Sequence, residues 1–430
     1  MSLSQLLNTR YFLPLFLTQF FGAFNDNAFK LAMLTSVSYY LSHSQIQSER
    51  YQVLASALFV LPFFVFSATA GQLADKLDKA HLIRWIKLFE IALMTMGGLA
   101  LYAGSIVWMM VTLTGLGVHS TFFGPIKYAI LPEHLAKSNL LGATALIEGS
   151  TFLAILLGTT FGTLSVLGTR AGSLGAILLT VGVALLGFLC SLKIPSTPSH
   201  AKELMINYNV WRATKQILVT AKQNKQAMMT IYLISWFWLI GGVILTKLPD
   251  YTNYVLRADT TIFALFLALF SIGIAMGSMA VNAGLRGKIQ LRIVPYAMLF
   301  LSLFACDLYW VSPVSSQVPL QSMAVFFKQT AHWRIACDLF LLAFSGGVFV
   351  VPLYAYLQVV SAPSVRARTI AANNIMNSLF MVLGSLYVMI LLYFQASIAQ
   401  VLLGIGVLNA FAAVYFRYFH VAFLENQEHT

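Results

Sequence analysis

Four polar residues interrupt a long apolar stretch near the start of the chain. The stretch covers residues 11–41 and is long enough to cross a bilayer, yet Asn25, Asp26, Asn27 and Lys30 lie in its middle. A carboxylate and an ammonium group are costly in hydrocarbon unless they face a protein interior or a watery cavity and find partners. We therefore expect these residues to line a substrate pathway or a gate.

Asp26 and Lys30 are four positions apart, so they share one face of a helix and can pair across a turn. Pairing lowers the free-energy cost of burying the carboxylate. The same residues also fit a purely structural ion pair, or polar contacts that hold helices together. The spacing alone leaves both interpretations open.

Three more ionisable residues lie in the fourth and fifth apolar stretches. Glu148 lies about two turns into residues 140–167, and Lys127 closes residues 107–129, so the two are candidate neighbours near the inner mouth of a pathway. Lys127 can instead extend its long side chain to the membrane surface, which a carboxylate does much less easily. His119 stands alone, which favours a hydrogen-bonded core histidine over a proton relay.

Uncharged side chains add a second group of candidates. Asn373 and Asn377 share a helical face with Asn374 beside them, and their amides suit a phosphodiester or a glycerol hydroxyl, although hydrogen bonding between helices is the commoner use. Trp238 could line a path for an acyl chain, or it could serve packing or anchoring. Lys247 follows in the same apolar stretch and is a candidate pathway cation.

The elements that must position these residues are membrane-spanning helices. The chain has 430 residues, of which 59% are hydrophobic and 9% charged, and this leaves too little polar surface for a soluble domain. Apolar stretches of about 20 residues recur along the whole length, whereas a barrel would show short alternating strands. We predict an all-α membrane protein with about twelve spans, at residues 11–41, 52–74, 81–103, 107–129, 140–167, 170–192, 228–249, 260–284, 289–311, 335–360, 366–394 and 398–419.

The positive charge follows the predicted topology. The net charge is +12, and with both termini in the cytoplasm the inner loops hold about three times as many lysines and arginines as the outer loops, Lys87 counted among the inner ones. This asymmetry is the one that the positive-inside rule requires. It predicts cytoplasmic termini and removes the reason to expect a nucleic-acid partner.

A polar segment divides the chain into two halves of six spans. Residues 193–227 form the predicted cytoplasmic linker between an N-terminal bundle, residues 1–192, and a C-terminal bundle, residues 228–430. A tight basic turn follows the second span of each half, at residues 71–79 and 282–288. Such a recurrence is typical of a parallel repeat.

The first of these turns reads GQLADKLDK and contains Gly71, Asp75, Lys76 and Lys79. A glycine permits a sharp turn out of a helix, and an acidic residue among cations can form ion pairs that hold one conformation until the helices part. The turn resembles the loop signature of the major facilitator superfamily. The resemblance implies two pseudo-symmetric six-helix bundles and a conformational switch at this loop.

Longer segments resemble one branch of that superfamily. They are RYFLPLFLTQFFGAFNDNAFKLAML, FFGPIKYAILPEHL, ISWFWLIGGVILTKLPDY, ALIEGSTFLAILLG and RARTIAANNIMNSLF, and they are similar to bacterial lysophospholipid transporters, especially to the transporter domain that other bacteria fuse to an acyltransferase and an acyl-carrier-protein ligase. The resemblance implies secondary or facilitative movement of lysophospholipids from the outer to the inner leaflet of the bacterial inner membrane by alternating access, with a role for Asp26. It also implies a separate acyltransferase acting on the transported lipid, membrane lipids as surroundings, and a monomer.

Two alternatives remain at this point. The same fold permits another amphiphile as substrate, such as a drug or a siderophore. A non-transporting membrane sensor or scaffold is disfavoured because the chain offers only the linker and a short tail at residues 425–430.

An enzyme is not predicted. The chain lacks a phosphate-binding loop, and none of its eight histidines is followed five positions later by the aspartate that the acyltransferase of the fused relatives would need. Three isolated cysteines show no metal-ligand spacing. We expect no cofactor, metal or catalytic residue.

Overall fold

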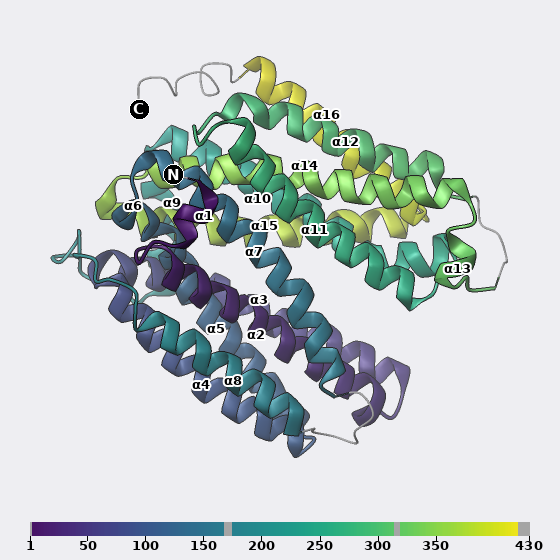
Figure 1. Cartoon of the computed structure of the whole chain (residues 1–430), viewed down its shortest axis with the longest axis horizontal. Helices are drawn as coiled ribbons and strands as arrows, with labels where there is room; N and C mark the ends of the chain where they lie inside the picture. The colour runs from purple at the N-terminus through teal and green to yellow at the C-terminus, as the bar shows by residue number, and fades with distance from the viewer. Residues whose placement is uncertain (1, 167–173, 314–318, 420–430) are drawn as a thin grey trace. The chain divides into compact units, whose positions relative to one another are not determined.

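The computed structural model describes residues 2–166, 174–313 and 319–419, and these residues form helices and loops (Figure 1). The predicted tail at 425–430 and the adjoining ends of the predicted spans 140–167 and 170–192 lie outside the described residues. Twelve long helices are present in the described part: α2 (Leu13–Ser36), α3 (Gln45–Lys76), α4 (Lys79–Tyr102), α5 (Ile106–Ala129), α7 (Lys137–Leu164), α8 (Leu174–Ser191), α10 (Lys225–Asp250), α11 (Thr260–Gly284), α12 (Val294–Val311), α14 (Thr330–Val360), α15 (Arg366–Tyr393) and α16 (Ile398–Phe419).

Eleven of these helices are long and apolar enough to cross a membrane by length and composition. The remaining one, α2, has 24 residues and carries the polar run that begins at Asn25. At about 1.5 Å per residue it also has the length to span the hydrocarbon core. The predicted all-α architecture is confirmed.

The predicted spans agree closely with the helices. Residues 260–284 and 398–419 match α11 and α16 at both ends, whereas α3, α7 and α14 begin several residues earlier than predicted. The hydropathy pattern does not reveal four shorter helices. One precedes α2, namely α1 (Leu3–Leu7), and three lie between long helices, namely α6 (Leu131–His134), α9 (Val210–Gln223) and α13 (Met323–Phe326).

The linker contains α9, an amphipathic helix within a segment that is predicted only to be polar. Ala213, Ile217 and Ala221 recur every four residues and are buried, and α9 contacts α3. Asn209 caps its N-terminus by accepting a hydrogen bond from the backbone N–H of Arg212 at 3.0 Å. The linker is therefore an ordered part of the structure here.

Two compact units divide the chain. The first comprises Met1–Ala143, Leu153–Met229 and Leu357–Ser378, and the second comprises Thr144–Phe152, Thr230–Tyr356 and Leu379–Thr430. Residues 144–152 of α7 belong to the second unit, whereas residues 357–360 of α14 and 366–378 of α15 belong to the first. The division of the chain into residues 1–192 and 228–430 with a linker between them stays a prediction.

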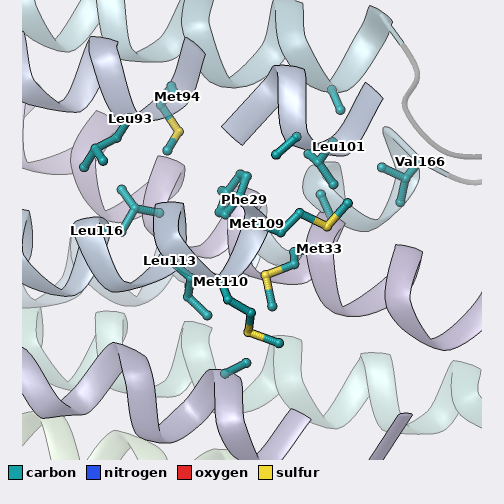
Figure 2. Close-up of a cluster of buried hydrophobic side chains, with 14 of the residues drawn as sticks. Phe29, Met33, Leu93, Met94, Leu101, Met109, Met110, Leu113, Leu116 and Val166 are labelled. Carbon is teal, nitrogen blue, oxygen red and sulfur yellow. The ribbon is translucent and has the colours of Figure 1, made fainter. Parts of the chain in front are cut away.

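The first unit has an apolar core formed where α2, α4 and α5 meet. Phe29, Met33, Met94, Met109 and Leu113 are fully buried in it (Figure 2). Helices α2, α4 and α8 contact one another, as do α3, α4 and α5. This core fixes the three helices that carry the ionisable side chains described next.

Candidate functional site

Four ionisable side chains from α2, α4 and α5 meet inside the first unit. On α4, the Nζ of Lys87 lies 2.6 Å from the Oε2 of Glu90. On α5, the Nε2 of His119 lies 3.3 Å from the same Glu90 oxygen, and its Nδ1 lies 3.8 Å from the Oδ1 of Asp26 on α2. We call Asp26, His119, Glu90 and Lys87 the ionic cluster.

Neutral groups complete the surroundings of the ionic cluster. The Nδ2 of Asn25 donates to the Oε1 of Glu90 at 3.1 Å and to the backbone carbonyl of Thr180 at 3.0 Å. The hydroxyl of Ser120 donates to the Oδ2 of Asp26. Phe123 stacks on His119 and also receives the ammonium of Lys87 at 5.0 Å from its ring centroid.

Local sequence explains why these groups can meet. Lys87 and Glu90 are three residues apart, which puts both on one face of α4. Opposite them on α2 stands Gly22, where a Cβ atom would lie 2.5 Å from the Nζ of Lys87. The absence of a side chain at Gly22 therefore leaves the space that the lysine ammonium occupies.

Exposure changes along the ionic cluster. The side chains of Lys87, Glu90 and His119 are 0%, 1% and 2% exposed, whereas that of Asp26 is 13% exposed. Charges this deeply buried persist only when they are paired, because removing one ion from water still costs several kcal/mol after the protein has relaxed around it. Asp26 is the member of the cluster that reaches the accessible surface.

The structure corrects three predictions. His119 does not stand alone, because the fold brings two carboxylates to its two ring nitrogens. Lys87 is not a loop cation but pairs inside the protein with Glu90, and the sequence signal for this pair is that both residues lie inside one apolar stretch, residues 81–103. Within the described part of the chain Lys30 makes no ion pair with Asp26, and its ammonium lies 5.5 Å from the ring centroid of Phe59.

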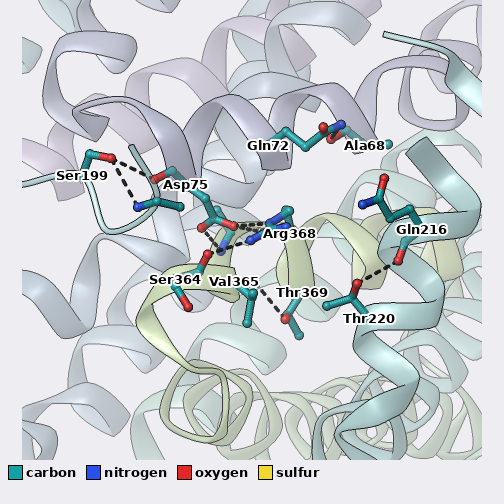
Figure 3. Close-up of polar contacts among 12 residues, drawn as sticks. Ala68, Gln72, Asp75, Ser199, Gln216, Thr220, Ser364, Val365, Arg368 and Thr369 are labelled. Carbon is teal, nitrogen blue, oxygen red and sulfur yellow. Dashed lines mark hydrogen bonds and ion pairs between the residues drawn. The ribbon is translucent and has the colours of Figure 1, made fainter. Parts of the chain in front are cut away.

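The carboxylate of Asp75 lies at the start of α15 (Figure 3). It is fully buried and accepts hydrogen bonds from the backbone N–H of Ala367 at 2.9 Å, from that of Arg368 at 3.2 Å and from the Nε of Arg368 at 2.9 Å. A negative charge at a helix N-terminus satisfies free N–H groups and interacts favourably with the helix dipole. Asp75 therefore forms an ion pair, and its partner is Arg368.

The other residues of the predicted switch loop lie in α3 and at the start of α4. Gly71 lies inside α3 rather than at a turn out of it, and a Cβ atom there would lie 2.6 Å from the Cβ of Ala371, so the glycine permits close approach to α15. Lys76 is half-buried at the end of α3. Lys79 begins α4 and is buried, with its Nζ 2.7 Å from the Oε1 of Glu133.

Asp78, between α3 and α4, ties the linker to this region. Its carboxylate caps α4 through the N–H of His81 at 3.0 Å and accepts hydrogen bonds from the hydroxyl of Ser196 and from the N–H of Thr197 at 3.2 Å. Partial burial raises the pKa of Asp78, but these hydrogen bonds to its charged form outweigh burial and hold the pKa below the ordinary value.

The predicted amide stripe on α15 is partly buried. Neither side-chain polar atom of Asn373 has a hydrogen-bond partner among the described residues, although this side chain is fully buried. Asn377 is buried and Asn374 is half-buried. On α2, Asn27 donates to the carbonyl of Ala23 on its own helix at 2.8 Å, and Lys127 lies over the ring of Tyr128 at 4.7 Å.

Three predicted residues lie in the second unit. Glu148 is buried, and the Nε1 of Trp238 donates to the hydroxyl of Tyr354 at 2.9 Å. Lys247 pairs with Asp250 at 2.8 Å and borders a pocket of about 290 Å³. The pocket is lined by α10 and α15 with Gly242, Val243, Thr246, Lys247, Gly384, Ser385, Val388, Met389 and Leu392.

A family model described as the Major Facilitator Superfamily matches residues 15–385. The lysophospholipid transporter LplT of Photorhabdus laumondii is 25% identical over 83% of this chain and 82% of its own length. The protein of the same name from Serratia proteamaculans is 25% identical over 86% and 85%. Among solved structures, the human organic anion transporter MFSD10 aligns with a TM-score of 0.72 at 14% identity, over 94% of this chain and 99% of that one. The fucose:proton symporter FucP of Escherichia coli aligns with a TM-score of 0.69 at 11% identity, over 95% and 99%.

Proposed function

The chain belongs to the Major Facilitator Superfamily, and on that premise we propose that it transports lysophospholipids across the bacterial inner membrane, from the outer to the inner leaflet. The observation that carries the substrate class is the similarity to proteins named lysophospholipid transporters over more than four-fifths of both chains. In this proposal both termini are cytoplasmic, the protein acts as a monomer, and a separate acyltransferase uses the delivered lipid.

The pocket in the second unit has chemistry that suits such a substrate. A lysophospholipid has a phosphodiester and one acyl chain. Lys247 offers a cation and Thr246 and Ser385 offer hydroxyl groups, while Val388 and Met389 form apolar wall. A charge-assisted contact with phosphate beside apolar surface is the combination that an anionic amphiphile requires.

The contact of Asp75 with α15 is proposed as a latch of the transport cycle. Transport by alternating access requires contacts that form in one state and break in another. The three hydrogen bonds to Asp75 all end on two consecutive residues of α15, so a small shift of that helix would break them together.

Uptake of labelled lysophosphatidylethanolamine tests the proposed function. Spheroplasts that lack this gene should take up less lipid than spheroplasts that regain it, and equal uptake would refute the proposal. Competition with a diacyl phospholipid, a cationic drug and a siderophore separates the substrate classes, and only an excess of unlabelled lysophospholipid should reduce uptake.

Two lysine variants test the pocket. Replacing Lys247 by Met should weaken apparent lipid affinity by about tenfold, the effect of losing one charge-assisted hydrogen bond. The matched control is Lys328→Met, which removes an exposed lysine outside the pocket and should leave affinity unchanged. Equal affinities of the two variants would remove Lys247 from the pathway.

A further inference from the structure

We infer that the linker helix α9 binds the headgroups of anionic phospholipids in the leaflet on its own side of the membrane. The stripe of α9 that contains Ile217 is buried, and α9 contacts α3. The opposite side of the helix is exposed, and we call its residues the basic face: Trp211, Arg212, Lys215, Val219 and Lys222. Such binding needs neither a transported substrate nor a transport cycle.

Hydrogen bonds hold both ends of α9 at the membrane surface. Just before α9, the backbone N–H of Asn207 donates to the Oε1 of Gln72 at 2.8 Å, and Gln72 lies one turn before the end of α3. Just after α9, the Nδ2 of Asn224 donates at 3.0 Å to the carbonyl of Val360, the last residue of α14. The next residue, Lys225, begins α10. Since α3, α10 and α14 are candidate membrane spans, both ends of α9 lie where spans end, and the helix runs along the surface instead of projecting from it.

The basic face carries cations that no carboxylate compensates. Arg212, Lys215 and Lys222 are exposed, and none of the three pairs with a carboxylate within the described part of the chain. Residues 204–249 include no aspartate or glutamate, and Glu203 precedes this range with a lysine beside it. A solvated surface usually mixes both signs of charge, so a segment this long with only one sign indicates an anionic partner.

The acidic groups close to the end of α3 are already engaged. Asp75 is buried and pairs with Arg368, and the Oε1 of Glu133 lies 2.7 Å from the Nζ of Lys79. Asp78 caps α4 and accepts a hydrogen bond from the linker. These carboxylates are therefore not available to neutralise the basic face.

Exposed apolar side chains stand among the cations of α9. Trp211 is 84% exposed, and Tyr208, just before the helix, is 74% exposed. Lys215 and Lys222 follow Trp211 by four and eleven residues, so all three lie on one stripe of the helix. Tryptophan and tyrosine favour the level of the headgroups, where neighbouring lysines and arginines reach the phosphates. Because α9 runs along the membrane surface, headgroups are the anionic groups that this face meets first.

The charge of the headgroup decides which lipids the basic face should gather. Phosphatidylglycerol carries a net negative charge, whereas phosphatidylcholine is zwitterionic. A lysine or arginine near an anionic surface strengthens association by about fivefold. The three cations together should therefore enrich phosphatidylglycerol over phosphatidylcholine around Trp211.

Quenching of Trp211 by brominated lipids tests the inference on the full chain in nanodiscs. The discs contain phosphatidylcholine with a rising fraction of either brominated phosphatidylglycerol or brominated phosphatidylcholine. The chain has seven tryptophans, so the emission of Trp211 is taken as the difference between each protein and the same protein with Trp211→Phe. We expect brominated phosphatidylglycerol to quench this emission at a lower fraction than brominated phosphatidylcholine.

Charge variants show whether the basic face sets this preference. Lys215→Gln should lower the preference for phosphatidylglycerol by about fivefold, and Lys215→Arg should keep it. The triple variant Arg212→Gln, Lys215→Gln and Lys222→Gln should lose the preference altogether, as should the wild type in about 1 M salt, where charges are screened.

A matched control removes three exposed cations from another turn of the chain. The triple variant Arg286→Gln, Lys288→Gln and Arg292→Gln should keep the wild-type preference at Trp211. Equal quenching by the two brominated lipids in the wild type, or an unchanged preference in the α9 triple variant, would overturn the inference. Trp211 emission that neither lipid quenches would also overturn it and would leave the basic face to an acidic soluble protein.

Discussion

Both units bury a polar cluster, but only the cluster of the first unit is charged. In the second unit, the amide of Asn409 on α16 accepts a hydrogen bond from the Nε1 of Trp236 at 2.9 Å and donates to the carbonyl of Met298 at 2.8 Å and to the hydroxyl of Ser302 at 2.9 Å. This neutral cluster joins α10, α12 and α16 with its amide oxygen and nitrogen both in use. It satisfies its groups in one fixed arrangement and has no proton to gain or lose.

The ionic cluster of the first unit differs in what its burial achieves. Buried ion pairs add little stability, because the desolvation of both ions offsets most of their attraction, and well-packed apolar side chains often serve as well. Stability alone therefore does not explain four ionisable groups inside α2, α4 and α5. The difference between the two clusters teaches that neutral hydrogen bonds join helices without any charge to compensate, whereas the ionic cluster joins its helices only as long as each buried charge keeps its partner.

Glu90→Ala should have the largest effect on stability. It leaves the ammonium of Lys87 buried without its carboxylate, and breaking a buried pair from one side costs about 3–5 kcal/mol. Unfolding of the detergent-solubilised protein measures this loss. The double variant Lys87→Met with Glu90→Met removes both charges and should recover most of it, and a double variant as unstable as Glu90→Ala would show that the pair itself stabilises the fold.

Asn409→Ala should cost about 2 kcal/mol, because it leaves the indole N–H of Trp236 without its acceptor and removes the hydrogen bonds to Met298 and Ser302. The same unfolding assay, repeated across pH, should show an equal loss at every pH since no group of the neutral cluster titrates. Ser302→Ala removes one of the three hydrogen bonds and is the milder control. A pH-dependent loss in Asn409→Ala would contradict the distinction between the two clusters.

Asp78 gives the smallest predicted effect and tests an ionisable group outside the buried clusters. The pKa of Asp78 in the folded protein lies below the ordinary value. Its contribution to the free energy of unfolding is therefore complete above about pH 4, the unfolded pKa, and is lost as the pH falls through the folded pKa. Asp78→Ala should cost about 1 kcal/mol at neutral pH through loss of the α4 cap. Asp78→Asn keeps a capping oxygen, so it should mainly lose the fall in the free energy of unfolding at acid pH. Unfolding at roughly pH 3 and pH 7, on either side of the unfolded pKa, measures this loss. An unchanged acid profile in Asp78→Asn would mean that other carboxylates set it.

Hydropathy and charge placement predicted the helical architecture because the membrane imposes strong local rules. A helix must be about 20 residues long and apolar to span the bilayer, so α11 and α16 were located to the residue. The amphipathic α9 was not predicted, since its apolar positions are few and lie within a polar segment.

The sequence by itself determined the membrane class, the helices and the presence of expensive polar residues such as Asp26, because these depend on composition and local spacing. Only the tertiary structure decided which of those residues meet. His119 follows Asp26 by 93 residues in the sequence, and it contacts both Asp26 and Glu90 because α2, α4 and α5 pack against one another. The partner of Asp75 is likewise Arg368, almost 300 residues away, because long-range pairing follows from helix packing and not from any period in the sequence.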